Sequence, residues 1–150
     1  MFAQDELASQ LVQCEAEARK ALANLRKIRE TTAAIVAKQL QAELSQLGME
    51  KSEISFNIVN SDTLTALGAD SIELLFSANK GEQLLPLHKV ASGGELARIA
   101  LAFKSVFTGD THKTLVFDEI DVGISGDIAL KVAEKILAIS HCNCEERAKA

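Results

Sequence analysis

The sequence predicts an α/β fold with a long N-terminal helix, on the basis of three observations. The chain has 150 residues, of which 47% are hydrophobic and 25% charged, as is typical of a soluble globular protein. Its single proline is Pro86, and neither glycine nor proline occurs before Gly48, so a helix can run unbroken there. Beyond residue 51, short strand-like patterns alternate with helical ones.

The first helix is predicted over residues 4–47, and its first part is predicted to be a coiled-coil arm. Small and hydrophobic residues recur there with a 3.5-residue period over four heptads. The heptad positions are Leu7, Leu11, Cys14, Ala18, Ala21, Leu25, Ile28, Thr32 and Ile35. After Ile35 the spacing shifts, so this end is expected to pack on a globular body and to stop at Gly48. The alternative is a single amphipathic helix on a domain surface, although about 40 residues exceed the usual length of such helices.

Two antiparallel strands are predicted next, over residues 52–60 and 71–78. Alternation places Ile54, Phe56 and Ile58 on one face of the first strand. A polar connection ending in a turn at residues 68–70 is expected between the strands. Residues 81–90, which include the proline, are expected to form an extended loop.

Helical spacing resumes directly after the sequence Ser-Gly-Gly-Glu at positions 92–95. A serine followed three residues later by a glutamate is a capping box, so a helix is predicted to begin here and to end at residues 109–110. Residues 114–117 are predicted to form a short buried strand of a parallel sheet, with Asp118 and Glu119 at its carboxyl end. A last helix is predicted to open at residues 125–127 and to run through Ile139.

Two of these segments are candidates for chemistry, although each also has an ordinary structural explanation. Glycines before a helix N-terminus let a phosphate approach the free N–H groups, but the same sequence is more often only a cap. Adjacent carboxylates at the end of a strand can serve Mg²⁺ and polarise a water molecule, but they are often merely solvated.

The order and spacing of the two segments are more specific than either segment alone. Gly94 precedes Asp118 by 24 residues, which matches the signature motif and Walker B motif of ATP-binding-cassette ATPases. The chain resembles the RecN family of bacterial DNA-repair proteins, in the SMC-like branch of these ATPases. The resemblance covers nearly the whole chain. It is carried by LGM at 47–49, ELLFSANKGE at 73–82, PLHKVASGGEL at 86–96 and FDEIDVGISG at 117–126.

The resemblance implies the C-terminal lobe of an ABC/SMC-type ATPase head, an incomplete P-loop NTPase fold, with the arm over residues 1–47 and the lobe over 48–150. Two heads would sandwich ATP in a homodimer, and the signature loop of one would contact the γ-phosphate held by the other. The residues implied for that loop are Ser92, Gly93, Gly94 and Glu95. Asp118 would hold Mg²⁺ through water, Glu119 would be the general base, and Asp121 would lie in the D-loop at the dimer seam.

The phosphate-binding sequence G-x-x-x-x-G-K-[ST] occurs nowhere in the 150 residues. The resemblance therefore implies an ATP hydrolase of DNA double-strand-break repair and recombination that is inactive without an N-terminal lobe carrying the P-loop. It further implies a cytoplasmic location at the bacterial nucleoid, contact with DNA ends through the full protein, and no membrane association. The alternative is a non-catalytic structural module that dimerises through the coiled-coil helix.

The charge distribution argues against a stand-alone DNA-binding protein. Residues 1–51 carry seven acidic and seven basic side chains, whereas residues 52–150 carry fourteen against nine, which gives the net charge of −5. The cysteines, at positions 14, 142 and 144, are odd in number and irregularly spaced, so they indicate a reducing cytoplasm rather than a disulfide framework.

The remaining predictions concern individual side chains. Arg98 is expected to form a surface ion pair, with support of the signature loop as the alternative. His141 lies only 22 residues after Glu119 with no second strand between, so it is not assigned as the family's switch histidine. Together with Cys142 and Cys144 it is expected to belong to an exposed terminus rather than to a metal site. His88 and His112 are expected to be surface residues.

Overall fold

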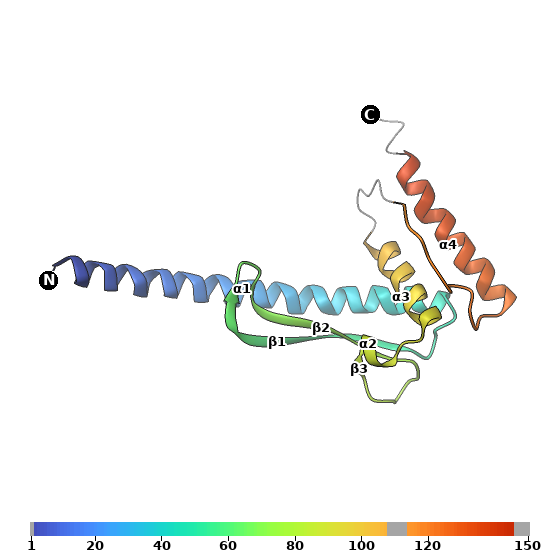
Figure 1. Cartoon of the computed structure of the whole chain (residues 1–150), viewed down its shortest axis with the longest axis horizontal. Coiled ribbons are helices and arrows are strands. Elements are labelled where there is room, and N and C mark those ends of the chain that lie inside the picture. Colours follow the sequence, from blue (N-terminus) through green and yellow to red (C-terminus); the bar gives the residue numbers. More distant parts are fainter. Residues whose placement is uncertain (1, 108–113, 146–150) are drawn as a thin grey trace.

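The computed structural model describes residues 2–107 and 114–145. Its helices are α1 (Phe2–Gln46), α2 (Leu87–Val90), α3 (Gly93–Val106) and α4 (Gly126–Glu145), and its strands are β1 (Glu53–Thr65), β2 (Gly68–Ser77) and β3 (Leu85–Pro86). The hairpin of β1 and β2 lies along the C-terminal half of α1, while α3 and α4 gather at the end of that helix (Figure 1). A mixed α/β fold with a long N-terminal helix was predicted and is confirmed.

The long helix α1 has two parts with different surroundings. Its 45 residues correspond to a rod of about 68 Å, and its N-terminal part projects beyond the rest of the molecule (Figure 1). Leu7 and Leu11 on this projecting part are 65% and 62% exposed. At the other end, Leu40 and Leu44 are fully buried. The shift in spacing after Ile35 therefore does mark the point where the helix enters a core, whereas pairing of the arm with another helix stays a prediction.

The end of α1 is set by Gly48, as predicted. This glycine has a φ of +80°, a left-handed conformation that other residues adopt only with strain. The backbone N–H of Met49 donates back to the carbonyl of Leu44 at 3.0 Å, which satisfies one of the free carbonyls at the helix end. The chain then reverses into β1, and the buried Ser52 hydroxyl donates to the Met49 carbonyl at 2.7 Å.

Strands β1 and β2 form a tight hairpin instead of two short strands with a polar connection. Their antiparallel register runs from Glu53 opposite Ser77 to Thr65 opposite Gly68, so the turn is only the two residues 66–67. The predicted turn at 68–70 is wrong because these residues already pair within β2. A register shift between Asn60 and Thr65 accommodates the polar residues that the sequence pattern assigned to a loop.

The hairpin is tied to α1 by charged side chains at its tip. Asp70, whose side chain is only 5% exposed, accepts a hydrogen bond from Arg29 at 2.9 Å and lies 3.8 Å from a second guanidinium, that of Arg26. Arg29 also donates to the backbone carbonyl of Leu67 in the turn. A Cβ added at Gly68 would lie 3.0 Å from Leu25. One heptad position of α1 therefore faces the chain's own hairpin.

Residues 81–90 are more ordered than the extended loop that was predicted. Leu85 and Pro86 form the short strand β3, which pairs with Phe76 and Leu75 of β2. Proline has no N–H to donate, which is tolerated at the edge of a sheet. A single turn of helix, α2, follows directly. In the described part of the chain the sheet is three-stranded and antiparallel, in the order β1-β2-β3.

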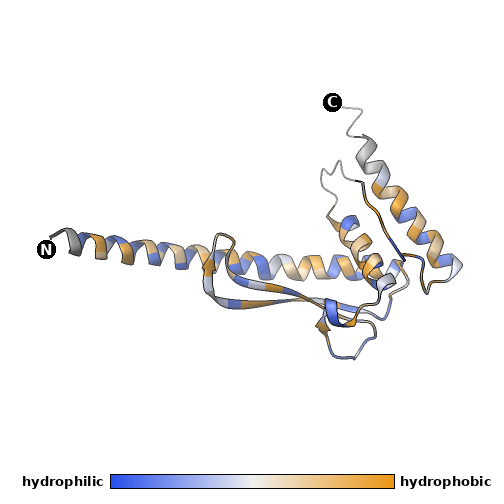
Figure 2. Cartoon of the chain, viewed as in Figure 1, coloured by the Kyte–Doolittle hydropathy of each residue, from blue (hydrophilic) through white to orange (hydrophobic). Residues whose placement is uncertain are grey.

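The core lies where the end of α1 meets the sheet, α3 and α4. Its buried hydrophobic residues are Val36, Leu40, Leu44, Leu47, Met49, Ile54, Phe76, Ile99, Leu101, Ala102 and Val132. An ion pair of 2.6 Å between Lys135 and Glu43 joins α4 to α1. Hydrophobic residues are spread along the arm and concentrated in the segment before α4 (Figure 2). Among residues 2–107 and 114–145, no helix is both long enough and apolar enough to cross a membrane.

The predicted buried strand at residues 114–117 is not formed. These residues are extended but pair with no strand in the described part of the chain, and they run between α3 and α4 (Figure 1). Leu115 and Phe117 are half-buried, while Val116 is 86% exposed. A strand of a parallel sheet needs at least one parallel neighbour to pair with, and the strands described here all belong to the antiparallel sheet. The apolar run therefore covers α3 with one face only.

Candidate functional site: the Ser-Gly-Gly-Glu loop and the acidic segment

Helix α3 begins at the predicted position, with the predicted capping box. The Ser92 hydroxyl accepts from the backbone N–H of Glu95 at 3.4 Å, and the Glu95 carboxylate accepts from the backbone N–H of Ser92 at 2.8 Å. Ser92 and Gly93 are exposed, whereas Gly94 is buried. The Glu95 side chain is thus committed to the cap, and the accessible part of the loop is Ser92 and Gly93.

The acidic segment after residue 117 forms a tight turn. Glu119 has a φ of 57°, which places a non-glycine residue in the strained left-handed region. The N–H of Val122 donates to the Glu119 carbonyl at 3.1 Å and closes the turn. The side chains of Asp118, Glu119 and Asp121 are exposed, so three carboxylates are presented within four residues.

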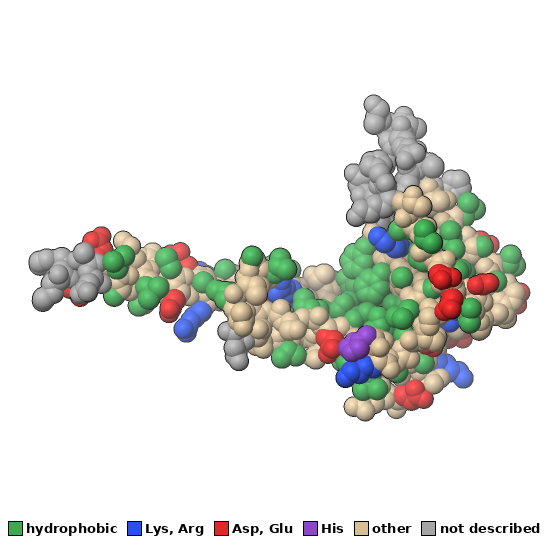
Figure 3. Space-filling view, viewed as in Figure 1, with side chains coloured by type: hydrophobic (Ala, Val, Ile, Leu, Met, Phe, Trp, Pro, Cys, Tyr) green, Lys and Arg blue, Asp and Glu red, His purple; other side chains and the backbone are tan. Residues whose placement is uncertain are grey.

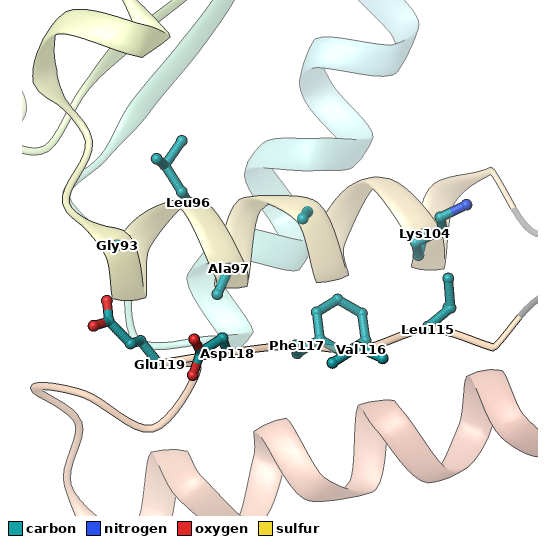
Figure 4. Close-up of a pocket in the computed structure, with 10 residues that line it drawn as sticks. Gly93, Leu96, Ala97, Lys104, Leu115, Val116, Phe117, Asp118 and Glu119 are labelled. Atoms are coloured by element: carbon teal, nitrogen blue, oxygen red, sulfur yellow. The ribbon is translucent and has the colours of Figure 1, made fainter.

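The loop and the acidic segment are in direct contact. A Cβ added at Gly93 would collide with a carboxylate oxygen of Glu119, and one at Gly94 would lie 3.1 Å from the carbonyl oxygens of both Glu119 and Val122. The Glu119 side chain points toward the start of α3 at Gly93 (Figure 4). Gly94 is therefore needed for the close approach of the two backbones, whereas the flexible Glu119 side chain could move away from a Cβ at position 93. The sequence-predicted site residues of both segments come together at one end of α3.

Arg98 connects the two segments from inside the protein. It is 7% exposed, and its Nη1 donates to the carbonyl oxygens of Val122 at 3.0 Å and of Ile120 at 3.5 Å. Burial lowers the pKa of its guanidinium below the ordinary value, and the negative charge of Glu95 opposes this shift. The predicted surface ion pair is wrong, because the side chain points into the protein and binds backbone carbonyls.

A cleft of about 470 Å³ extends from the site along α3. It lies between one face of α3 and the extended residues 115–119 (Figure 4). Its other lining residues are Gly93, Leu96, Ala97, Ala100 and Lys104. Hydrophobic side chains gather on the surface in this part of the molecule (Figure 3). The site is therefore charged at the start of α3 and apolar along the middle of the helix, with Lys104 at the far end of the cleft.

The residues of this site could hold a Mg²⁺–nucleotide only together with groups supplied by another part of a binding site. In the described ranges no cluster of three or more histidine, cysteine or acidic side chains could hold a metal by itself. Asp118 offers one exposed carboxylate, which suits Mg²⁺ because this ion keeps several waters and takes few protein ligands. The exposed helix start at Ser92 and Gly93 suits a phosphate, but it supplies only one side of a binding site.

Arg98 is the site residue whose role the sequence analysis did not assign correctly, although a signal for its burial exists. The buried positions of α3 are Gly94, Arg98, Ile99, Leu101 and Ala102, so the arginine stands in the hydrophobic stripe at helical spacing. A charged residue in that stripe requires a buried partner. Its partners, the carbonyls of residues 120 and 122, have no sequence signature.

Several predictions fall outside the described residues or concern the surface. The predicted helix end at residues 109–110 and the predicted surface position of His112 lie outside them, as do the side chains of His141, Cys142 and Cys144. Helix α3 ends at Val106. The predicted α4 is confirmed from Gly126 onward. His88 is exposed, in agreement with the sequence analysis, and Cys14, one of the predicted heptad positions, is also exposed.

Comparison with known proteins decides the family. The chain is 42% identical to the DNA repair protein RecN of Bacillus subtilis, in a match that covers 79% of this chain and 23% of that protein. It is 39% identical to the RecN of Synechocystis, with 90% and 23% covered, and 34% identical to that of Mycobacterium leprae, with 91% and 26% covered. The chain is a RecN homologue. The resemblance inferred from the motifs is thereby confirmed.

The RecN homology concerns a limited part of the relatives. The chain spans about a quarter of the length of the curated RecN proteins it matches. No protein-family model matches the chain. The activity of a complete RecN protein can therefore only be proposed for this chain.

Proposed function

We propose that this RecN homologue supplies the signature motif and the Walker B motif of an ATPase head, with residues 1–47 as its arm and residues 48–150 as the C-terminal lobe. The observation that carries the proposal is the contact of the Ser-Gly-Gly-Glu loop with the acidic turn. Gly93 lies directly against the Glu119 side chain, although 26 positions separate them in the sequence. A solvated pair of acids or an isolated helix cap would not require this contact.

The proposed roles follow from the exposure and chemistry of each residue. Ser92 and Gly93 present a hydroxyl and backbone at a helix N-terminus, where the positive end of the helix dipole favours a phosphate. Gly94 allows the acidic turn to approach, and Glu95 holds the cap that shapes the loop. This loop contacts the γ-phosphate bound by a second head, and Asp121 lies in the D-loop at the seam between heads.

The carboxylates have separate proposed tasks. Asp118 holds Mg²⁺ through water, and the ion supplies charge neutralisation at the phosphates when it is bound. Glu119 accepts a proton from the water that attacks the γ-phosphate. The strained φ of 57° at Glu119 supports such a role, because strained residues persist where the surrounding structure holds them in place and cluster at active sites.

A second lobe carrying the P-loop is the proposed partner of this chain. Val116 is 86% exposed beside the apolar cleft, and the segment around it pairs with none of the described strands. Strands of the N-terminal lobe would pair with this segment and cover it. ATP and Mg²⁺ are the proposed ligands of the completed head, and a homodimer of heads is its proposed working form. The proposed process is DNA double-strand-break repair in the bacterial cytoplasm, in which the full assembly contacts the DNA ends.

A chimera tests this function. The chain replaces the matched segment of the Bacillus subtilis RecN, and ATP hydrolysis is compared between the chimera, the isolated chain and the remaining RecN segment alone. Hydrolysis is expected only in the chimera, because the isolated chain has no P-loop. Hydrolysis by the isolated chain, or a folded chimera that binds ATP without hydrolysing it, would contradict the proposal.

The structural-module alternative is favoured by one observation, the exposure of heptad residues on the projecting part of α1. Leu7 and Leu11 are both more than 60% exposed. If the arm pairs two copies of the chain, Leu11→Asp is expected to halve the particle mass measured by light scattering. Leu25 is unsuitable for this test because it packs near the hairpin turn at Gly68. An unchanged mass in Leu11→Asp would exclude the arm as the contact.

A further inference from the structure

Arg98 occupies an unusual position for a charged residue. Arg98 lies one turn into α3, on the buried stripe of the helix, where only 7% of the residue is exposed. Its Nε–H has no hydrogen-bond partner among the described residues. A buried guanidinium with an unpaired N–H is costly, so its retention requires an explanation beyond packing.

The bonds that Arg98 does make all go to one turn. Its Nη1 donates to the carbonyl oxygens of Val122 and Ile120, at 3.0 and 3.5 Å. This turn contains the strained Glu119 and is closed by the bond from the Val122 N–H to the Glu119 carbonyl. The carbonyls that Arg98 binds thus belong to the residues that flank Asp121 and follow Glu119.

Gly94 makes the same connection from the backbone side. A Cβ at this position would lie 3.1 Å from the carbonyl oxygens of Glu119 and Val122 and 3.3 Å from Nη1 of Arg98. The start of α3, the arginine and the acidic turn are therefore packed in a single contact. Residues 93, 94 and 98 belong to the same rigid helix, so a movement of the loop is transmitted to the turn.

We propose that Arg98 is a positioning residue that locks the turn of Glu119 and Asp121 to the Ser-Gly-Gly-Glu loop, so that both halves of the site move as one unit. The effect of Arg98 on catalysis rests on the proposed ATPase function. The lock itself, meaning the hydrogen bonds from Arg98 to the turn, does not depend on that function. An arginine suits this task because one planar nitrogen directs two N–H groups at neighbouring carbonyls. A lysine keeps the charge and can donate to a carbonyl, but its single nitrogen has no fixed fork.

The lock can be tested on the isolated chain by amide hydrogen exchange. Arg98→Met fills most of the same volume but removes the donors, so peptides covering residues 118–124 are expected to exchange at least about tenfold faster. Peptides covering residues 36–47 of the core are expected to be unchanged. Lys135→Met is the matched control, because it removes a different ion pair, that of α4 with Glu43, and should leave residues 118–124 unaffected.

Two outcomes of the exchange experiment would overturn the lock. One is unchanged exchange over residues 118–124 in Arg98→Met. The other is an equal acceleration over residues 36–47, which would mean that the arginine only stabilises the fold. Arg98→Lys is expected to recover part of the protection, and an exchange rate equal to that of Arg98→Met would contradict the role of a donated hydrogen bond.

The effect on catalysis is measured separately, in the chimera with Bacillus subtilis RecN. Arg98→Met is expected to lower kcat about tenfold or more with KM for ATP changed less than about twofold, because a displaced turn misplaces Glu119 without touching the nucleotide. Arg98→Lys is expected to lie between this variant and the parent. A rise in KM at constant kcat would overturn the positioning role. If the parent chimera lacks activity, the proposed function fails, but the exchange result still decides the lock.

Discussion

In the chimera, Glu119→Gln is expected to lower the rate of ATP hydrolysis by about 100-fold or more. A general base contributes roughly 10²–10⁴-fold to a rate, and glutamine cannot accept the proton from water. The substitution keeps the size and the hydrogen-bonding shape of the side chain, so the contact with Gly93 is retained. ATP binding is therefore expected to persist, and a steady-state phosphate-release assay combined with a nucleotide-binding measurement separates the two.

The matched control for this variant is Glu73→Gln. Glu73 is an exposed residue of β2, and its neutralisation changes the net charge by the same amount without touching the site. Its rate of hydrolysis is expected to equal that of the parent chimera. Equal rates in Glu119→Gln and the parent would remove Glu119 from the chemistry and leave its packing against Gly93 as its only role.

The acidic turn shows how far sequence reasoning reaches and where it stops. The capping box at Ser92 and the start of α4 were predictable because each depends on residues within one helical turn. The approach of the Gly93 loop to Glu119 was implied only by motif order. The bond from Arg98 to the carbonyl of Val122 could not be predicted, because any residue type presents the same carbonyl.

The segment at residues 114–117 was mispredicted for a different reason. Its apolar composition favours a strand that is covered on both faces, but a strand also needs backbone partners, and these are not encoded in the strand itself. In the structure it is extended, with Val116 exposed and the backbone unpaired with any described strand. The composition and the structure agree if the missing neighbours come from another lobe, as the proposed function requires.

The sequence suggests a division between an arm over residues 1–47 and a lobe over residues 48–150, but the end of the long helix packs in the core of the lobe. Residues 36–47 continue the long helix without a break, yet their hydrophobic side chains belong to the same core as Phe76 and Ile99. The hairpin adds a second attachment through Asp70, which lies against Arg29 of the helix. A rigid connection between arm and site follows, because α3, with its loop at Gly93, packs on this end of α1.

Leu44→Ala is expected to lower the free energy of unfolding by about 2–5 kcal/mol. The loss measures how much the packing of the end of α1 in the core stabilises the fold. Leu44 is 0% exposed at the end of α1, so truncation removes buried methyl groups and leaves a cavity. Leucine and alanine have similar helix propensities, so the loss reports packing rather than helix formation. Urea unfolding followed by circular dichroism is suitable, since the chain has no Trp or Tyr.

Leu130→Ala is the matched control, with the same truncation in a helix at a residue that is 65% exposed on α4. Its cost is expected to stay within about 0.5 kcal/mol, as for other surface substitutions. A single domain typically has only about 5–15 kcal/mol of stability, so the loss at Leu44 would remove a large part of it. Similar values for the two variants would mean that the end of α1 is an appendage. A large difference would place the base of the arm inside the lobe, where a movement of the arm reaches the loop at Gly93 through packed side chains.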